Sequence, residues 1–300
     1  MMRTLTVLIC THDRRPLLSK ALASLDAARR PSNWQIAIKV MANACSDDTL
    51  TWLAQRNHGL PLEFGHEPRP GKSNALNRAL PEISTDAVTF VDDDHRVDEG
   101  YLEAVCEAFD RHPDIDMLCG RILPDWDGSE PPWVHDQGPY RIYPLPVPRF
   151  DLGDVPTEVP TGRAIPGGGN IAVRTSWLAR IGEFSTALGP KGHNLGGAED
   201  IEWVKRGLAL GARLHYAPRM IQYHYVEGSR LRTSYVVRKA FVRSSSVARV
   251  DGVTPAAYML RKCLSYLGSA ATALSIARRR YYLVRFAASL GELHGALKNR

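Results

Sequence analysis

The sequence predicts an α/β protein with a mainly parallel central sheet, helices on both faces of that sheet, and a helical C-terminal extension. Two observations predict the sheet: short apolar runs alternate with segments of helical spacing, and several of these runs end in polar clusters. Such alternation is typical of strand–helix–strand units, whose strands pair in parallel beneath covering helices. The third observation is an excess of positive charge in residues 229–300, which sets the extension apart.

The predicted strands are near-continuous apolar runs, as expected where both faces of a sheet are covered. They lie at residues 5–10 (LTVLIC), 36–43 (IAIKVMAN), 61–67 (PLEFGHE) and 87–94 (AVTFVDDD). Apolar residues at helical spacing predict helices between and after these strands, and one helix starts from a Ser/Asp cap. These helices are expected at residues 17–28, 46–57, 71–83 and 101–113.

The second half of the sheet region is less regular. Residues 121–166 are rich in Pro and aromatic residues and show little periodicity, which predicts an irregular excursion over a binding face. Order returns in residues 166–184, where we expect a glycine-rich turn, a short strand and a helix. A further helix and strand are expected in residues 196–218.

The cysteines and the N-terminus indicate a cytoplasmic protein. The five cysteines are scattered, odd in number and without a CxxC pair, which favours reduced thiols and no zinc site. The apolar run in the opening residues, MMRTLTVLICTHDRR, ends too soon for a convincing signal peptide.

The net charge of +6 conceals a division along the chain. Residues 229–300 hold 14 Lys and Arg against 2 acidic residues, a net of +12, and the preceding residues hold 24 basic against 30 acidic, a net of −6. An acidic front suits an enzyme that uses a metal ion, and a basic tail suits phosphate, in nucleic acid or in anionic lipid. No base-reading motif accompanies the charge, so we do not expect nucleic-acid binding.

The extension looks helical and suits an anionic membrane surface. Its longest uncharged run, Cys263–Ala277, has 15 residues, fewer than the roughly 20 that a spanning helix needs. Basic residues bracket this run, which favours a helix lying in the surface, with Tyr281 and Tyr282 at the headgroup level. The alternative is a helical hairpin packed on the catalytic core or on the second subunit of a homodimer.

Polar clusters follow three of the predicted strands. They are Thr11–Asp13, Asn43–Thr49 and Asp92–Asp94. The carboxyl ends of parallel strands share one edge of a sheet, where ligands bind in such folds, so we expect one site there. Three adjacent carboxylates repel one another, so they belong around a cation or, alternatively, on an acidic turn that caps the next helix.

The ordered set of motifs carries a resemblance to a known family. THDR, NACSDDT, RPGKSNALN, VDDD, PGGGN, GAEDIEW and a late His together resemble the nucleotide-sugar glycosyltransferases of family 2, over roughly residues 4–230. The resemblance implies the GT-A fold, which is Rossmann-like, in a catalytic domain of residues 1–228. Within it, residues 1–120 form the nucleotide-binding half and residues 121–228 the acceptor half, and residues 229–300 form the basic extension.

The resemblance also implies a divalent cation. A sugar diphosphate gains negative charge as the glycosidic bond breaks, and Mn²⁺ or Mg²⁺ stabilises that charge without proton transfer. By resemblance to the family's DxD motif, Asp94 binds the metal, and Asp92 binds the ribose or a water bound to the metal. His224 resembles a further metal ligand, since neutral imidazole suits Mn²⁺. Asp93 is grouped with the nucleotide site but is expected to point back into the structure.

The remaining nucleotide contacts are assigned by position in the same motifs. Their hydrogen-bonding groups are expected to hold the base, ribose and diphosphate, and a turn of small residues approaches the donor sugar. The residues are Thr11, Asp13, Asn43, Asp47, Arg69, Lys72, Asn77, Gly168, Gly169 and Asn170. The family commonly has Asp where Asn43 stands, and an amide both donates and accepts, so the choice of uridine over guanosine is less secure.

The segment GGAEDIEW supplies the candidate catalytic base. Inversion at the anomeric carbon needs a carboxylate that takes the proton of the acceptor hydroxyl. Asp200 resembles the base of the family's ED motif, and Glu199 orients the acceptor or caps the helix. Trp203 is expected to offer an apolar ring face to a sugar. The alternative is an ordinary acidic helix start.

Together these features predict an inverting glycosyltransferase. It would use a UDP-sugar and a metal ion to extend a lipid-linked or cell-envelope glycan, from a peripheral position on the cytoplasmic face of the membrane. One alternative is a nucleotidyltransferase of similar fold, but that class needs a glycine-rich loop after the first strand, and THDRRP has no Gly. Another alternative is a regulatory scaffold that binds nucleotide sugars without catalysis. The presence of Asp200, the candidate base, disfavours this alternative.

Overall fold

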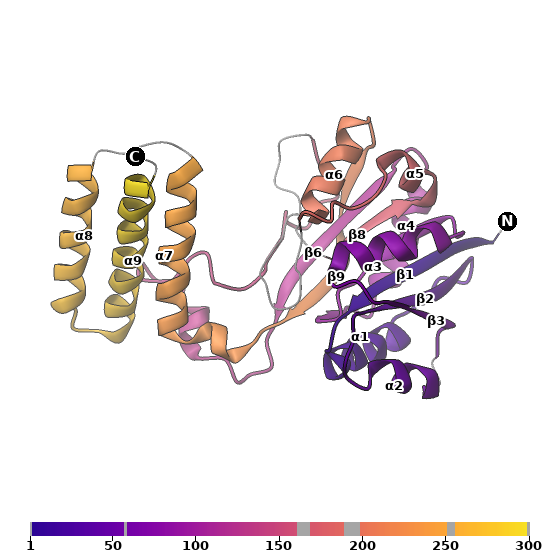
Figure 1. Cartoon of the computed structure of the whole chain (residues 1–300), viewed down its shortest axis with the longest axis horizontal. Coiled ribbons are helices and arrows are strands. Elements are labelled where there is room, and N and C mark those ends of the chain that lie inside the picture. The colour runs from indigo at the N-terminus through magenta and orange to yellow at the C-terminus, as the bar shows by residue number, and fades with distance from the viewer. Residues whose placement is uncertain (1, 57–58, 161–168, 189–198, 251–255, 299–300) are drawn as a thin grey trace. The chain divides into compact units, whose positions relative to one another are not determined.

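The computed structural model describes residues 2–56, 59–160, 169–188, 199–250 and 256–298 (Figure 1). The chain forms two units. The sheet unit comprises Met1–Asp125 and Arg149–Tyr225, and the helical unit comprises Trp126–Pro148 and Val226–Arg300. The predicted domain boundaries at residues 120 and 228 stay predictions, and the structure adds that a segment from the middle of the chain belongs with the C-terminal helices.

The sheet unit is built on a mixed sheet with the strand order β3-β2-β1-β4-β8-β6-β9-β5, and β7 pairs with β9. The strands are β1 (Arg3–Thr11), β2 (Trp34–Asn43), β3 (Leu62–Glu67), β4 (Ala87–Phe90), β5 (His95–Val97), β6 (Met117–Asp125), β7 (Thr157–Glu158), β8 (Ile171–Arg174) and β9 (Leu214–Tyr225). The predicted parallel pairing holds for β1 to β4 and for β6 with β9, whereas β5, β7 and β8 run antiparallel to their neighbours. The predicted α/β class is confirmed.

Helices cover both faces of this sheet. They are α1 (Arg15–Ala27), α2 (Thr49–Gln55), α3 (Lys72–Ala79), α4 (Tyr101–Arg111), α5 (Leu178–Ile181) and α6 (Glu199–Ala209), with 3-10 turns η1 (Leu80–Glu82) and η3 (Thr175–Trp177). In β1, Leu5, Val7 and Ile9 pack with α1 and α4 on one face, whereas Leu8 packs with α3 and α6 on the other. Successive side chains of a strand face opposite ways, so β1 contributes to both layers of the core.

The irregular excursion predicted from residue 121 begins later than expected. Strand β6 continues to Asp125 because it stays paired with β9 past a bulge between Gly120 and Arg121. The two backbones approach so closely there that a Cβ on Gly120 would overlap the carbonyl oxygen of Met220. A glycine at a bulge permits this approach. In the described residues after β6, up to residue 160, the regular elements are η2 (Pro132–His135) and β7.

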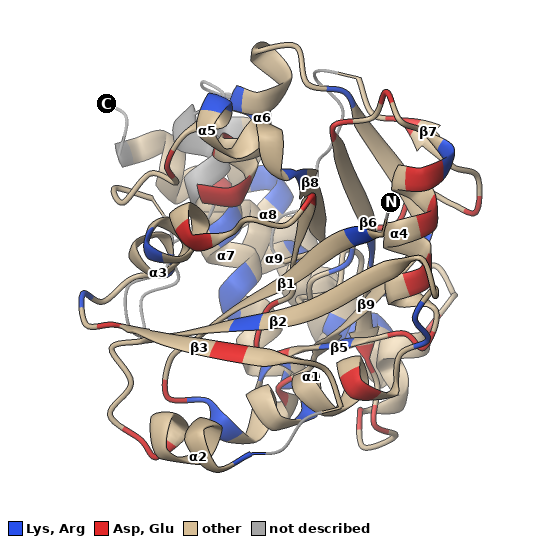
Figure 2. Ribbon diagram, turned by 90° about the vertical axis from the view of Figure 1, so that its right-hand side faces the viewer, with Lys and Arg blue, Asp and Glu red and all other residues tan. Residues whose placement is uncertain are grey.

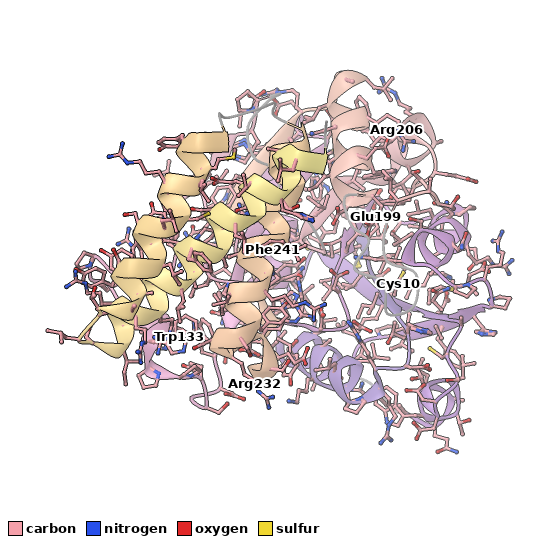
Figure 3. All side chains as sticks on the ribbon, turned by 60° about the vertical axis from the view of Figure 1, so that its left-hand side comes forward. Cys10, Trp133, Glu199, Arg206, Arg232 and Phe241 are labelled. Carbon is pink, nitrogen blue, oxygen red and sulfur yellow. The ribbon has the colours of Figure 1, made fainter. Side chains whose placement is uncertain are left out.

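The helical unit contains α7 (Thr233–Val250), α8 (Ala256–Ala271) and α9 (Ile276–Lys298), preceded by η4 (Gly228–Leu231). Helix α9 packs against both α7 and α8. Gly291 of α9 allows close contact with the backbone of Phe241 in α7, which is labelled in Figure 3. Trp133, Val134 and Ile142 of the middle segment form a small core with residues of η4 and α7.

The expectation of a single surface helix over Cys263–Ala277 is wrong. Helix α8 ends at Ala271 and α9 begins at Ile276, where the Arg278 N–H donates a 3.2 Å hydrogen bond to the Ser275 hydroxyl. Such a cap starts a new helix, so the uncharged run forms the turn of a helical hairpin. No helix in the described part of the chain is long and apolar enough to cross a membrane.

Candidate functional site

A cavity of about 290 Å³ opens at the carboxyl ends of β1, β2 and β4, the edge predicted from the sequence. The start of α3 and the end of β9 complete its wall. The lining residues are Cys10, Thr11, His12, Asp13, Arg14, Asn43, Lys72, Asp92, Asp93, Asp94 and His224. The structure therefore brings together the polar ends of three strands that lie far apart in the sequence.

Three potential metal ligands converge at one end of this cavity. Asp94, His95 and His224 each place a ligand atom within 4.8 Å of the others. Asp94 Oδ1 lies 3.8 Å from Nε2 of His95, and Asp94 Oδ2 lies 3.8 Å from Nε2 of His224. The two histidines are register partners in the antiparallel pair β5 and β9, so the sheet itself holds their rings side by side.

The hydrogen bonds of the two histidines fix which ring nitrogen carries the proton. His95 Nδ1 lies 2.5 Å from Oε1 of Gln222, whose Nε2 donates to carbonyl oxygens of Phe90 and Gly169. Because Gln222 Oε1 only accepts, His95 Nδ1 must donate. His224 Nδ1 likewise donates to the carbonyl oxygen of Tyr225 at 2.5 Å. In the neutral form of each ring, Nε2 carries the lone pair and faces Asp94, and burial lowers the pKa of His224 toward that form.

Asp92 is held by a different set of partners. Its Oδ1 accepts a 2.5 Å hydrogen bond from Lys72 Nζ, and its Oδ2 accepts one of 3.0 Å from the Gly169 backbone N–H. A Cβ on Gly169 would lie 2.6 Å from the Asp92 nitrogen, so this contact requires glycine. Burial raises the pKa of Asp92, but the charge and hydrogen bond of Lys72, together with the neighbouring His95 and His224, outweigh it and keep the pKa well below its usual range. The role predicted for Asp92 at the metal stays a prediction.

Asp93 lies inside the fold, as its alternation with Asp92 and Asp94 predicts. It is 6% exposed, and the Thr11 hydroxyl donates to its Oδ2 at 2.8 Å. Arg14 Nη1 donates to Asp93 at 3.2 Å and to Asp94 at 3.1 Å. Burial and the neighbouring charge of Asp94 raise the pKa of Asp93 to about 6, so this carboxylate is costly to ionise where it stands.

Asn43 positions the loop that precedes α3. Its Nδ2 donates to the carbonyl oxygens of Glu67 (3.2 Å) and Arg69 (2.7 Å), and its Oδ1 accepts the N–H of Gly71 at 2.7 Å. Gly71 has a φ of 128°, which favours glycine, and Lys72 follows it directly as the first residue of α3. A carboxylate would not reproduce the two donated bonds, which gives a physical reason for the amide at this position.

Several other residues predicted to bind the nucleotide have partners within the protein. Asp13 accepts hydrogen bonds from the Ser46 N–H and hydroxyl, which lower its pKa. Asp47 accepts the Thr49 N–H at the start of α2. The others, each with its partner, are Arg69 with Glu67, Asn77 with Phe184, and Asn170 with Arg121 and Met220. Their contacts with a nucleotide stay predictions; Gly168 lies outside the described residues.

The predicted catalytic pair lies at the start of α6, where Figure 3 labels Glu199. Glu199 is 3% exposed, burial raises its pKa, and its Oε2 has no hydrogen-bond partner among the described residues. The charges of Asp200 and Glu199 both raise the pKa of Lys72, which places them in its electrostatic neighbourhood. The open ring face predicted for Trp203 is wrong: the ring is 1% exposed and stacks on Phe184 at 4.7 Å.

Comparisons with known proteins show which family the chain belongs to. A model of the family described as "Glycosyl transferase family 2" matches residues 6–167, more than half of the chain. The chain belongs to this family. The succinoglycan biosynthesis protein ExoM of Rhizobium meliloti (strain 1021) is 22% identical over 303 residues, which cover 96% of this chain and 91% of that protein.

A second relative is longer than this chain. The pre-mycofactocin glycosyltransferase of Mycobacterium tuberculosis (strain ATCC 25618 / H37Rv) is 28% identical over 189 residues, 62% of this chain. The match covers 36% of that protein, so the chain spans about a third of its length. A crystal structure of S. aureus TarS is likewise matched over 46% of its chain, with 91% of this chain covered, 16% identity and a TM-score of 0.58.

Two further comparisons concern shorter solved structures with ligands. S. aureus TarS 1-349 in complex with UDP-GlcNAc superposes with a TM-score of 0.59 at 16% identity, covering 98% of this chain and 91% of that one. The mannosyltransferase PcManGT from Pyrobaculum calidifontis, in complex with GDP-Man and Mn²⁺, gives 0.56 at 17% identity, with 98% and 86% covered. At this identity the likeness shows the fold, and the GT-A fold predicted from the sequence is confirmed.

The structure adds residues to the candidate site that sequence reasoning missed. His95 stands directly after the acidic triplet, and Arg14 directly after Asp13, so both were adjacent to predicted positions. Cys10 lines the cavity at the end of β1, and burial raises the pKa of its thiol to about 12, so it stays protonated. The position of His95 directly after Asp92–Asp94 was the signal in the sequence that could have identified it as an additional metal ligand.

Proposed function

We propose that this protein is an inverting, metal-dependent glycosyltransferase that transfers a sugar from a UDP-sugar to a hydroxyl group of a glycan or glycolipid. The observation that carries the proposal is the convergence of Asp94, His95 and His224, with both Nε2 atoms facing the carboxylate. Asp94 and His224 line the cavity at the strand ends. Family membership makes sugar transfer the chemistry to expect of such a cavity.

The donor set fits a divalent cation that accepts both oxygen and nitrogen ligands. One carboxylate and two neutral imidazoles suit Mn²⁺ better than Mg²⁺, which prefers oxygen. We assign Asp94, His95 and His224 as the metal ligands, with His95 added to the residues predicted from the sequence. A bound cation would stabilise the negative charge that grows on the departing diphosphate. The relative PcManGT was solved with GDP-Man and Mn²⁺, which supports a metal-bound nucleotide sugar here.

The strand ends next to the metal ligands are assigned to the nucleotide. Thr11, Asp13 and Asn43 line the cavity where the base and ribose would lie, and Lys72 brings a cation to its edge. The UDP-GlcNAc complex of TarS supports a uridine donor. Because Lys72 is paired with Asp92, its charge is fixed in place rather than carried on a mobile side chain.

Asp200 is assigned as the catalytic base. The resemblance at GAEDIEW supports this role, and so does the electrostatic influence of Asp200 on Lys72 at the cavity. The carboxylate would accept the proton of the acceptor hydroxyl as the sugar–oxygen bond forms, which gives inversion in one displacement. The buried Glu199, whose raised pKa reflects burial, is assigned to orienting the acceptor.

The acceptor is assigned to the class of lipid-linked or cell-envelope glycans, reached from the cytoplasmic face of a membrane. The similarity to ExoM, a succinoglycan biosynthesis protein, supports a polysaccharide product. The net charge of +12 in residues 229–300 supports contact with anionic lipid. Helix α8 and the turn after it also expose Leu260, Leu264, Leu267 and Leu274, an apolar row suited to a membrane surface.

Calorimetric titration with nucleotides tests the site. UDP, GDP, CDP and dTDP are each titrated with Mn²⁺ and with EDTA, on the wild type and on Asp94→Ala. We expect UDP to bind only with Mn²⁺ and the substitution to abolish binding. Binding of no nucleotide, or binding indifferent to metal and to Asp94, would refute the proposal.

Asp200→Asn separates an enzyme from a binding protein that has lost catalysis. In an enzyme this change removes sugar transfer and leaves metal-dependent UDP binding within about twofold of the wild type, because the amide keeps the shape of the side chain but cannot take a proton. Transfer from UDP-sugars, assayed as UDP release with a mixture of lipid-linked glycans, is the readout. Unchanged release in the variant would exclude Asp200 as the base.

A further inference from the structure

The helical unit contains a groove that the proposed transfer reaction does not use. Two adjoining cavities of about 450 and 240 Å³ share the residues Ile142, Tyr143, Val284 and Arg285. They lie where residues 137–146 run along α7 and α9. We call the two together the basic groove.

Its charged side chains all carry the same sign. Lys239 and Arg243 of α7, Arg285 of α9, and Arg141 line the groove. Among the described residues, no carboxylate oxygen lies within 4.0 Å of a side-chain nitrogen of these four. Lys and Arg recur along α7, where they are blue in Figure 2. The groove therefore carries an excess of positive charge, which Glu292 partly offsets at Arg285.

Three acidic side chains of the helical unit form ion pairs outside the groove. Glu130 pairs with His135, Glu227 with Arg230 and Glu292 with Lys262. Within the groove, Lys239 donates only to the carbonyl oxygen of Pro146, at 3.3 Å, among the described residues. Burial and the neighbouring charges of Arg230 and Arg243 lower the pKa of Lys239, as expected where cations gather without an anion.

The walls between these cations are apolar. Ile142, Leu145, Val236 and Val284 line the groove beside the basic side chains. Tyr143 lies at both cavities with 80% of its surface exposed. A large exposed aromatic ring beside arginines is typical of side chains that sit at the headgroup level of a membrane.

We propose that the basic groove binds the phosphate group of a phosphorylated lipid, with the cations of α7 and α9 around the phosphate and the first carbons of the lipid chain against the apolar wall. Clustered Lys and Arg satisfy the charge and the acceptor oxygens of a phosphate. The apolar wall gives a hydrocarbon chain an advantage over free phosphate, because each buried methylene adds favourable free energy. The site shares no lining residue with the strand-end cavity, so lipid binding can be measured without sugar transfer.

Binding of a short-chain lipid tests this site directly. Dihexanoyl phosphatidic acid, kept below its micelle concentration, is titrated calorimetrically into the full chain, with inorganic phosphate and hexyl β-glucoside as separate arms. We expect the phosphatidic acid to bind at least tenfold more tightly than either. Equal affinity for inorganic phosphate would indicate a bare anion site, and equal affinity for the glucoside an apolar one; both results would overturn the proposal.

Matched variants locate the site. Lys239→Gln with Arg243→Gln removes two charges from the groove, whereas Arg238→Gln with Arg261→Gln removes two exposed charges of the same unit outside it. We expect the first pair to weaken lipid binding at least tenfold and the second to leave it within twofold. Unchanged melting temperatures and circular dichroism confirm that both variants fold. Equal losses in the two variants would mean general charge attraction and would overturn the assignment.

Discussion

Lys72 Nζ lies 2.5 Å from Asp92 Oδ1, and this ion pair joins the first turn of α3 to the chain directly after β4. Both side chains are about four-fifths buried, with 22% of each exposed. Neither charge can be removed alone without leaving the other in a poorly solvated place. The pair therefore fixes the position of two groups at the strand-end cavity before any ligand arrives.

Lys72→Met is expected to destabilise the protein more than its loss of charge alone suggests. The Asp92 carboxylate keeps the Gly169 N–H but loses its cation, at a cost of about 3 kcal/mol in the free energy of unfolding. Combining Lys72→Met with Asp92→Asn should recover part of that loss, because no charge is then left unpaired. Urea unfolding of the two single variants and the double variant gives the coupling energy. Strictly additive effects would show that the pair does not act as a unit.

His95→Ala should weaken Mn²⁺ binding at least about tenfold, to the same degree as His224→Ala. The two Nε2 atoms face the same Asp94 carboxylate, and even partners outside a metal's ligand shell contribute about tenfold in affinity. The measurement is Mn²⁺ titration in the presence of UDP. His66→Ala, on the exposed edge strand β3, is the control and should leave the affinity unchanged. A normal affinity in the His95 variant would remove it from the ligand set.

Asn43→Asp is expected to disturb the start of α3 even though Asp is common in the family at this position. The carboxylate cannot donate hydrogen bonds to the Glu67 and Arg69 carbonyl oxygens, and its negative charge would repel them. We expect the free energy of unfolding to fall by about 2–3 kcal/mol. UDP affinity should fall in parallel, because Lys72 follows this loop. Asn74→Asp removes a single, more exposed bond to Pro70 and should cost much less. Retained stability and UDP binding in Asn43→Asp would contradict the positioning role.

Gly169→Ala tests the close contact with Asp92. The added methyl would lie 2.6 Å from the Asp92 nitrogen, so the backbone must shift, at a cost of about 1–3 kcal/mol. Because Asp92 is two residues from Asp94, Mn²⁺ affinity should fall as well. Gly228→Ala is the control, since nothing lies within 4 Å of a methyl there. If Gly169→Ala were as stable as the wild type, the backbone at Gly169 would be able to move away from Asp92 without cost, which would contradict this prediction.

The sequence predicted where the site lies better than it predicted which atoms form it. Asp94 and His224 were expected together because both resemble metal ligands of the family, and the structure places Asp94 Oδ2 3.8 Å from His224 Nε2. The strand predicted to run through Asp94 ends instead at Phe90. The His95 N–H then donates to the Asp92 carbonyl oxygen, and this turn is what brings His95 into β5 beside β9.

Partners that are distant in the sequence explain the other differences. Asn43 holds a loop 24 to 28 residues away, and Asn77 exchanges hydrogen bonds with the backbone of Phe184. The spacing of residues along the chain does not reveal either contact. Both side chains were therefore predicted to bind the nucleotide. The same holds for Trp203, whose ring the sequence could not distinguish from an open sugar platform.

Glu67 should make stability depend on pH in a defined window. Arg69 donates to it from the side chain and from the backbone N–H, and these bonds lower the pKa of Glu67 from its ordinary value of 4.5 to about 2. Because the pKa of Glu67 is lower in the folded protein, the ionised carboxylate stabilises the protein fully above pH 4.5, and this contribution is lost as the pH falls toward 2.

Glu67→Gln should therefore lower the free energy of unfolding by about 1 kcal/mol at pH 7, the value of a partly exposed ion pair, and by clearly less at pH 3. Urea unfolding at both pH values measures this. Glu63→Gln, an exposed site on the same strand, is expected to have little effect at either pH. An equal cost of Glu67→Gln at pH 7 and pH 3 would show that the side chain contributes through packing rather than through its charge.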